Sequence, residues 1–571
     1  MNSEVTMEQK ELAIPTLVRE AAEEAAHPQR LIEAALAAVT GDVGALFEEE
    51  VLDALRQRRA TDPADYARVR DQAKKLNPGV RQAELDRLTK GEASFEPSAI
   101  DLLVAVAKEG CRLCHDEDRR GVAIIEGEKR QIWFVRGEGF AEWLRAKYYE
   151  AHEAGLSDAT VAAAVATIEA IGVHRGEKVA VHQRCAKHEG AYFIDLCDEG
   201  WRAIKVDETG WEIVDRPPAL FTRTPAMRAL PMPERDGDIE RLWEYVNIPE
   251  TLRPIVLTWL IESMRPDTPF PVLELVGEQG SAKSTTHRHL RELIDPNKVL
   301  LRGSPKTIED VYVAAASAWI VSYENLSGLT ADQQDALCTL STGGGFATRQ
   351  HYTNGSEHVL STKRPVMLNG IAVVATRPDL IERTVHVEMP EIAPDRRRED
   401  SDLSAQWQVE RPRIFGALLN LFVKALGILP NVVLTERQRM ADFERLGEAV
   451  VQARGGHPGD FVARYSEMVR EGKARSLENF DVVQALESMM IERIKMNVCE
   501  WSGTVGELYK ALPWQRGYGY SNWPQSAKGL ANQLRRLAPA LRATGLIIEF
   551  HARSNTGRKV TIRRLPAKEV S

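Results

Sequence analysis

This sequence of 571 residues has little cysteine, no long apolar run and no basic leader. No stretch approaches ~18 consecutive apolar residues, so we expect neither a transmembrane helix nor a membrane partner. The start, at 1–5, lacks the basic and apolar segments of a signal peptide, and we expect none. Six cysteines in so long a chain cannot form the disulfide framework of a secreted protein, which favours a reducing cytoplasm.

Charge is unevenly distributed along the chain. The formal net charge is −9, which by itself argues against wholesale binding of polyanions. Residues 501–571, however, hold 12 Lys and Arg against 3 Asp and Glu, so this segment carries +9 and the first 500 residues carry −18. A basic module on an acidic body is typical of a nucleic-acid-binding protein. A solvated basic tail is the alternative.

Changes of composition and periodicity predict a multidomain α/β protein. Alternating strands and helices are typical of an α/β core, and short β-rich runs separated by turns predict an antiparallel meander before it. The predicted regions are a helical one at 1–95, an α+β one with antiparallel strands at 96–235, an α/β core at 236–392, a helical one at 393–495 and a basic one at 496–571.

A glycine-containing loop between a predicted strand at 271–276 and a predicted helix at 286–293 has the order of a P-loop. Its backbone N–H groups would bind phosphates, Lys283 would reach the β/γ oxygens of ATP, and Ser284 would ligate Mg²⁺. Ala282 replaces the usual glycine before the lysine, and the alternative is a simple glycine turn with an incidental lysine. The predicted ATP-binding residues are Gly277, Glu278, Gln279, Gly280, Ser281, Ala282, Lys283, Ser284 and Thr285.

A second predicted strand, 319–323, ends in Glu324 and Asn325. A P-loop ATPase needs a carboxylate at such a strand end, and Glu324 would hold the Mg²⁺ shell or polarise water. Asn325 stands where many such enzymes carry a second acid, so the catalytic base stays open between Glu324, Asp335 and Glu357. An ordinary core strand with a solvated end is the alternative.

A third predicted strand, 365–369, ends in Asn369, whose amide would orient the attacking water. Arg383, just before the next strand, is the first candidate for an arginine finger that reaches a neighbouring subunit, and Arg377 is the second. The alternative is a surface ion pair of Arg383 with Asp379 or Glu382.

The string at 277–285 resembles ATP-binding proteins of phages and integrative elements, which are related to the helicase part of poxvirus-type primase-helicases and to superfamily 3 helicases. The resemblance is strong over about 240–395 and weaker at 90–240 and 395–500. It implies an AAA+-like P-loop core at 236–392, an often hexameric ring with ATP between subunits, DNA translocation and a bacterial host. Relatives often carry aspartate at the position of Glu324. Further matching stretches are 324–327, 335–338, 342–349, 364–371 and 377–380.

The resemblance also suggests a pore hairpin between the second and third strands of the core. Such a hairpin would grip the phosphates of single-stranded DNA in a central channel. A glycine-rich surface loop is the alternative. The predicted contacts are Arg349, His351, Lys363 and Arg364.

The basic module reads as helices at 504–512 and 526–537 followed by strands at 546–552 and 559–563, which suggests a winged helix that binds duplex DNA. A protein–protein module is the alternative. The predicted DNA contacts are Lys528, Arg535 and Arg536 on the helix and Arg553, Arg558 and Lys559 on the wing.

Two polar clusters upstream suggest chemistry that we discount. The first cluster consists of two groups that have short internal spacings and lie about 70 residues apart in sequence, and we therefore favour buried unligated cysteines over a zinc site. The groups are Cys111, Cys114 and His115, and His182, Cys185 and His188. Asp195 and Asp198 suggest a polymerase or primase metal site, and we interpret them as a strand end and turn.

The combined expectation is an ATP-dependent DNA motor, a ring-forming replicative helicase of a phage or mobile element. The alternative is an ATP-switched replication initiator or loader without unwinding activity. A full primase-helicase is a third possibility, but residues 1–230 lack recognisable priming chemistry.

Overall fold

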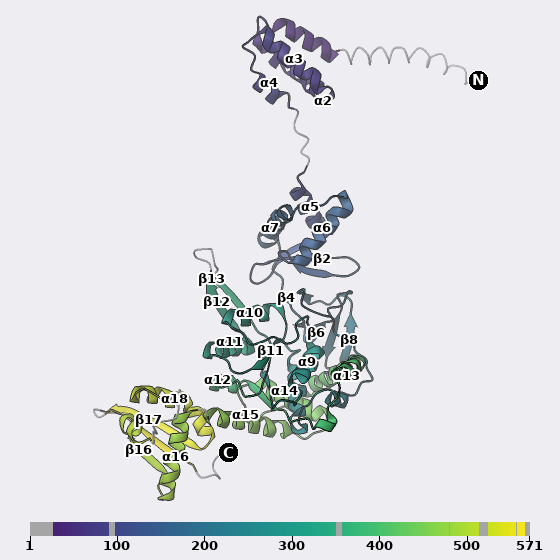
Figure 1. The fold of residues 1–571 in the computed structure, drawn as a ribbon. Helices are drawn as coiled ribbons and strands as arrows, with labels where there is room; N and C mark the ends of the chain where they lie inside the picture. Colours follow the sequence, from purple (N-terminus) through teal and green to yellow (C-terminus); the bar gives the residue numbers. More distant parts are fainter. Residues whose placement is uncertain are drawn as a thin grey trace, which may run out of the picture. The chain divides into compact units, whose positions relative to one another are not determined.

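The computed structural model describes residues 27–90, 97–349, 357–478, 480–512, 523–554 and 557–565 (Figure 1). The chain divides into two compact units, 1–103 and 104–571. The first unit is helical, and its small core contains Leu46, Leu55 and Tyr66. Asp62 caps the helix that starts at Pro63, a residue suited to a first helical position. The elements of this unit are a helix at 27–38, η1 Val43–Phe47, α2 Glu49–Thr61, α3 Pro63–Leu76 and α4 Gln82–Leu88, and α5 Ala99–Gly110 leads into the second unit.

The second unit begins with two antiparallel sheets. The first has the order β1-β2-β3, with β1 Arg112–His115, β2 Gly121–Ile125 and β3 Gln131–Phe134, and is followed by α6 Glu138–His152 and α7 Asp158–Arg175. The second is a meander in the order β5-β6-β7-β8. Gly190, with a φ of +86°, forms the tight turn between its first two strands. The meander strands are β5 Cys185–His188, β6 Ala191–Asp195, β7 Ala203–Asp207 and β8 Gly210–Val214, and the short β4 Val181–His182 pairs with β9 Leu220–Phe221.

A four-stranded parallel sheet forms the centre of the second unit, so the predicted α/β character is confirmed. Its order is β11-β14-β10-β15, its strands are parallel, and most of their residues are buried, as is usual for a parallel sheet covered on both faces. The strands are β10 Val272–Val276, β11 Val321–Leu326, β14 Val366–Gly370 and β15 Thr384–Glu388. The accompanying helices are η2 Ile239–Glu244, η3 Glu250–Leu252, α8 Arg253–Glu262, α9 Lys283–Ile294, α10 Ile308–Ser317, α11 Ala331–Thr342 and α12 Pro378–Ile381, and β12 Gly344–Arg349 pairs with β13 Glu357–Thr362 as an antiparallel hairpin.

The part of the second unit that follows the parallel sheet in sequence is helical. Among the described residues one segment, 400–431, is long and apolar enough to cross a membrane by length and composition, and half of its apolar window is buried. A single helix of this kind is weak evidence for a membrane span, because a buried core helix has the same composition. Trp407, Phe415 and Phe422 of this segment lie in the main core. Gly416 allows close packing, because a side chain there would meet the backbone carbonyl of Glu234. The elements are η4 Pro394–Arg396, α13 Asp400–Ile428, η5 Leu429–Asn431, α14 Ala441–Ala453 and α15 Asp460–Glu478.

The C-terminal residues form their own core around Leu486, Leu508 and Leu534. Thr504 and Glu507 form a capping box at the start of a short helix. The elements are α16 Asp481–Lys495, β16 Glu500–Thr504, α17 Val505–Ala511, α18 Ala527–Ala543, β17 Leu546–Ser554 and β18 Gly557–Arg564, and the three strands form an antiparallel sheet in the order β16-β18-β17.

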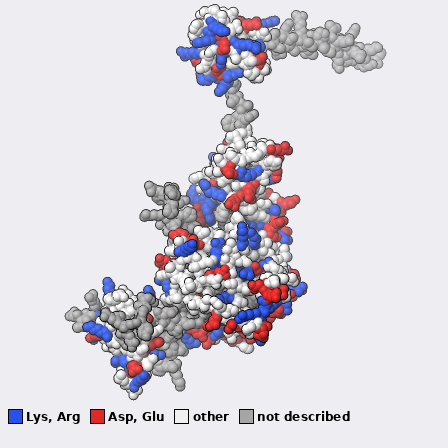
Figure 2. All heavy atoms as spheres, in the orientation of Figure 1, with Lys and Arg blue, Asp and Glu red and all other residues white. Residues whose placement is uncertain are grey.

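On the face drawn in Figure 2, basic and acidic side chains are interspersed over the body of the protein.

Candidate nucleotide-binding site

The loop at 277–282 joins the carboxyl end of β10 to the first residue of α9. Gly280 has a φ of +87° and Ala282 a φ of +55°, so both adopt the left-handed conformation. Glycine enters this region freely, whereas alanine pays about 1–3 kcal/mol for it. The position of Ala282 is therefore one where glycine is the easier residue, which explains why the usual pattern has glycine there.

The side chain of Lys283 folds back over this loop. Its Nζ donates to the carbonyl oxygens of Gly277 and Glu278, both at 2.7 Å, and burial lowers the pKa of its ammonium group. Asn247, which sequence reasoning missed, supports the loop from outside: its Nδ2 donates to the carbonyl of Ser281 and its N–H to the hydroxyl of Thr286. The N–H groups at the start of α9 and a lysine beside them can together bind an anionic phosphate.

Strand register brings the other predicted residues to the same edge of the sheet. Val276 of β10 and Leu326 of β11 both pair with Gly370 of β14, so the three parallel strands end side by side. Glu324 and Asn325 lie in a bulge of β11, where Asn325 has a φ of +53°. The Ser284 hydroxyl and the Glu324 carboxylate are oxygen donors of the kind that Mg²⁺ prefers.

Asn369 lies in the middle strand of this edge and is fully buried. Its Oδ1 accepts from the N–H of Asn325 at 2.9 Å, and its Nδ2 lies 2.9 Å from Nδ1 of His287 on α9. His287 is a contact that the sequence did not reveal, because a histidine one turn into an amphipathic helix carries no recognisable signal.

The segment after β14 is held by two side chains that were also missed. Glu274 of β10 accepts from the N–H groups of Val374 and Ala375, at 2.7 and 3.1 Å. Gln334 of α11 accepts from the next two N–H groups, those of Thr376 and Arg377, at 3.0 and 2.9 Å. A glutamate inside an otherwise apolar strand was the available signal, because a buried carboxylate requires partners.

The two candidate finger arginines differ in accessibility. Arg383 is 9% exposed, and its guanidinium pairs with Asp379 of its own chain at 2.7 Å, which is the alternative that the sequence left open. Arg377 has a 37% exposed side chain and pairs at 3.1 Å with Asp335, one of the candidates for the catalytic base. Of the two, Arg377 is therefore the one whose guanidinium is open to a neighbour.

The residues at the base of the β12–β13 hairpin, Lys363 and Arg364, are partly buried and hydrogen-bond within their own chain, so their contact with DNA stays a prediction. Lys363 donates to the carbonyl of Thr268 at 2.8 Å. The Arg364 guanidinium donates to Ala315, to Lys363 and to Gln183, and burial lowers its pKa to about 10. These contacts tie the base of the hairpin to neighbouring segments of the chain. The side chains of Arg349 and Glu357, and all of His351, lie outside the described residues.

The predicted DNA contacts of the C-terminal region are exposed where the structure describes their side chains. The buried face of α18 is apolar, and the helix contains no acidic residue. Arg535 donates to Asn532 at 3.2 Å, and its guanidinium lies 4.9 Å from the ring centre of Phe550. The exposed predicted contacts are Lys528, Arg535, Arg536, Arg558 and Lys559, whereas the side chain of Arg553 is not described.

The two clusters that we discounted as metal sites, the Cys/His groups and the pair Asp195 and Asp198, lie in the α+β region. Within the described ranges, no three His, Cys, Asp or Glu side chains form a group that could hold a metal ion. Cys114 and Cys185 are buried thiols. Asp195 pairs with Arg223 at 2.6 Å and Asp198 with Arg202 at 2.7 Å, which fits their interpretation as strand-end and turn residues.

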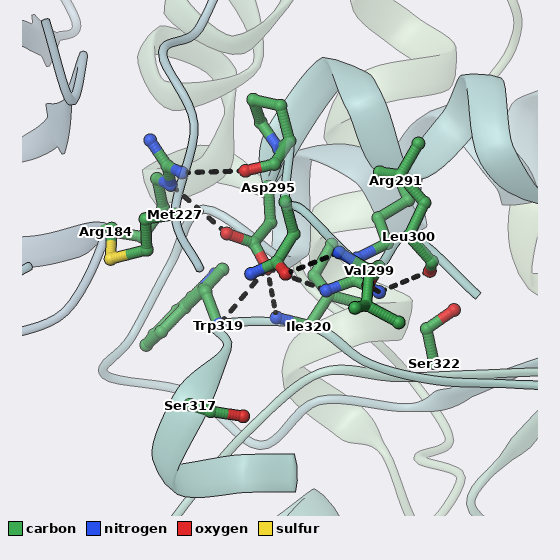
Figure 3. A network of polar contacts seen from close by, with 12 residues as sticks. Arg184, Met227, Arg291, Asp295, Val299, Leu300, Ser317, Trp319, Ile320 and Ser322 are labelled. Atoms are coloured by element: carbon green, nitrogen blue, oxygen red, sulfur yellow. Dashed lines mark hydrogen bonds and ion pairs between the residues drawn. The ribbon is translucent and has the colours of Figure 1, made fainter. Parts of the chain in front are cut away.

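A buried ion-pair network lies at the far end of α9 (Figure 3). Asp295 pairs with Arg184 at 3.3 Å and with Arg291 at 3.4 Å, and it accepts from the N–H groups of Trp319 and Ile320. Arg184 precedes the meander, whereas Trp319 and Ile320 lead into β11. The network therefore connects the α+β region, the helix of the glycine loop and the strand of Glu324.

The fold and the site define a mixed α/β protein whose candidate phosphate-binding loop lies at the carboxyl edge of a parallel sheet. Residues 239–460 match a family model described as the actinomycete integrative conjugative element replication protein, and residues 482–569 match one described as the AICE RepA C-terminal domain. Over these two stretches the chain is similar to a replication protein of integrative elements, which confirms the resemblance drawn from the motifs.

Solved structures are similar to the chain at low identity, and two of them match most of its length. The structure titled "SCCmec type IV Cch - active helicase" is 10% identical with a TM-score of 0.40, and the match covers 78% of this chain and 90% of that one. The structure titled "The A form apo structure of NrS-1 C terminal region-CTR" is 12% identical with a TM-score of 0.34, and the match covers 82% and 100%. Similarities this low do not define a shared function. No curated protein is significantly similar to the chain.

Proposed function

We propose that this protein is an ATP-dependent DNA motor, a ring-forming replicative helicase of a mobile element that works in the bacterial cytoplasm. The observation that carries the proposal is the glycine loop with Lys283 folded over its carbonyl groups, at the same sheet edge as Glu324 and Asn369. The family description as a replication protein supports DNA as the partner.

The proposed reaction is hydrolysis of ATP, with each residue of the site in one role. The loop N–H groups and Lys283 bind the phosphates and stabilise charge at the β/γ bridge. Ser284 and Glu324 hold Mg²⁺, which neutralises phosphate charge when bound. Asn369 orients the attacking water with the amide hydrogen that its contact with His287 leaves free.

A second subunit completes this site in the proposed ring, for which a hexamer is the expected size. An arginine from the neighbour stabilises the charge that develops on the transferred phosphoryl group. We assign this role to Arg377 rather than to Arg383, because the guanidinium of Arg383 is already paired within a largely buried site. Glu274 and Gln334 fix the backbone that carries Arg377.

Two surfaces are proposed to bind DNA. The β12–β13 hairpin, with Arg349 and His351, lines the channel for single-stranded DNA. The order α16, β16, α17, α18 and β-hairpin, with the first and last strands paired, supports a winged helix that binds duplex DNA through α18.

An ATP-switched initiator or loader is the second candidate, and Asn325 favours it. This residue replaces the second acid of the Glu324 strand, and its N–H is already used to bind Asn369. An amide cannot act as a general base, so this candidate function predicts slow hydrolysis of ATP, which suits a switch.

One set of measurements separates the two candidates. ATP turnover is measured with and without single-stranded DNA, and separation of a forked duplex is followed in both polarities, for wild type and Arg349→Ala. A motor separates the fork and loses DNA-stimulated turnover in the variant. If neither polarity is unwound and the variant behaves as wild type does, the initiator is correct.

A further inference from the structure

His287 lies one turn after Lys283 on α9 and is fully buried. Both nitrogens of its ring are engaged. Nδ1 lies 2.9 Å from the amide nitrogen of Asn369, and Nε2 lies 2.5 Å from the hydroxyl of Ser322 on β11. The ring therefore connects the helix of the glycine loop with both β14 and β11.

The direction of each hydrogen bond in this chain follows from its neighbour. The backbone N–H of Asn325 can only donate, so the atom of Asn369 that faces it is the amide oxygen. The amide nitrogen then faces His287, and because an amide nitrogen only donates, Nδ1 must be the unprotonated acceptor. The ring proton is left on Nε2, which donates to Ser322. Burial lowers the pKa of His287 to about 3, which keeps this neutral form.

We propose that His287 is a positioning residue that fixes the amide of Asn369 and, through the N–H of Asn325, the bulge that carries Glu324. The inference rests on the proposed ATP hydrolysis, in which Asn369 orients water. Without an acceptor at Nδ1, the buried amide nitrogen of Asn369 loses its partner, and only the N–H of Asn325 still holds the amide. A rotation that brings the nitrogen to another acceptor would turn it toward this N–H, where two donors repel each other. The bulge, and with it the carboxylate, would lose its fixed position.

The expected effect is on the chemical step and not on nucleotide binding, because the residues that hold the loop, Lys283 and Asn247, do not contact the ring in any hydrogen bond described for the site. Misplacement of a reacting group by about 1 Å lowers turnover by up to roughly a hundredfold. A residue that only fills the core would instead change stability, and activity would fall in step with the folded fraction.

Three variants test the proposal, because two of them mimic different ring nitrogens. In His287→Asn the amide oxygen takes the place of Nδ1 and can accept from Asn369. In His287→Gln the longer amide reaches the place of Nε2 and can hydrogen-bond to Ser322 instead. In His287→Leu the side chain can hydrogen-bond to neither Asn369 nor Ser322. For each variant kcat and KM for ATP are measured together with the melting temperature.

We expect kcat of His287→Asn to stay within about threefold of wild type. The kcat values of His287→Gln and His287→Leu should fall by about tenfold or more, with little change in KM. The proposal is overturned if kcat falls equally in His287→Asn and His287→Gln, or if kcat follows the melting temperature across the three variants.

A second measurement does not depend on hydrolysis. In protein labelled with ¹⁵N-histidine, the resonances lost in His287→Asn identify the ring, and we expect an unprotonated Nδ1 and a protonated Nε2. A proton on Nδ1 overturns the inference whatever the turnover is. If wild type does not hydrolyse ATP at all, the proposed function fails, and the labelled spectrum alone decides the role of His287.

Discussion

The guanidinium of Arg184 and the carboxylate of Asp295 lie 3.3 Å apart, and neither side chain is exposed to solvent. Arg184 has a φ of +59° and also donates to the carbonyl oxygens of Asp195 and Arg228. Asp295 ends the helix that Lys283 begins. The α+β region is thus joined to the helix of the glycine loop by charges that water cannot screen.

We expect Asp295→Ala to be strongly destabilising. Removal of the carboxylate leaves Arg184 and Arg291 buried without their partner, and breaking such a pair costs about 3–5 kcal/mol of unfolding free energy. Urea unfolding followed by tryptophan fluorescence measures the change. Asp158→Ala is the control, because Asp158 pairs with Arg145 while fully exposed, and its midpoint should stay where it is. Equal shifts in the two variants would contradict the structural role of the network.

Lys283→Ala should abolish ATP hydrolysis, because it removes the cation that neutralises the β/γ oxygens. Loss of such transition-state stabilisation lowers turnover by about two to three orders of magnitude. Steady-state phosphate release provides the measurement, and Lys298→Ala, an exposed lysine beyond the same helix, is the matched control. Turnover of Lys283→Ala within about threefold of wild type would remove the P-loop assignment.

Arg377→Ala should stop hydrolysis while leaving nucleotide binding intact, because the proposed finger acts only on the phosphate of a neighbouring subunit. Arg383→Ala should instead lower the melting temperature, since it breaks the pair with Asp379. In a mixture of Arg377→Ala and Lys283→Ala subunits, some interfaces combine an intact glycine loop with an intact arginine finger. Part of the ATP hydrolysis should therefore return in the mixture. An inert mixture in which mixed rings demonstrably form would exclude action between subunits.

The pH dependence of stability should report the buried His287. Its pKa is lowered to about 3 in the folded protein, so below its unfolded value of about 6.5 the unfolded chain binds the extra proton. The stabilisation is therefore complete above pH ~6.5 and is lost as the pH falls toward 3, at up to about 1.4 kcal/mol per pH unit. Unfolding free energies of wild type and His287→Asn between pH 5 and 7.5, in roughly half-unit steps, give this difference. Parallel curves would show that His287 does not titrate in this way.

The sequence predicted those parts of the fold and site that local patterns determine. The parallel strands follow from apolar runs, and the loop at 277–282 follows from its position between a strand and a helix. Contacts between distant segments were not predictable, because hydrogen bonds such as that between Glu274 and Val374 depend on which strands become neighbours. The contacts of Arg364 were missed for the same reason, because the carbonyl of Ala315 and the side chain of Gln183 belong to distant segments that only the fold brings to it.

The exposed cations of α18 are the proposed contacts of the C-terminal region with duplex DNA. Lys528, Arg535 and Arg536 are exposed on a helix without acidic residues, so their charges are available to phosphates. Arg563 is basic too, but it pairs with Glu500 at 2.9 Å and with Glu549 at 3.0 Å, so its charge is already neutralised.

Replacing the three α18 residues with glutamine should weaken duplex binding and flatten its dependence on salt, because each lost phosphate contact lowers the logarithmic slope by about 0.9. Arg563→Gln, which removes the same charge from a paired site, should leave that slope unchanged. Duplex affinity at several salt concentrations measures both effects, and circular dichroism confirms that α18 is still folded. If the two substitutions flatten the slope equally per charge, binding depends on net charge alone and α18 is not the DNA-binding surface. If neither changes the slope, the α18 residues do not contact the phosphates of the duplex.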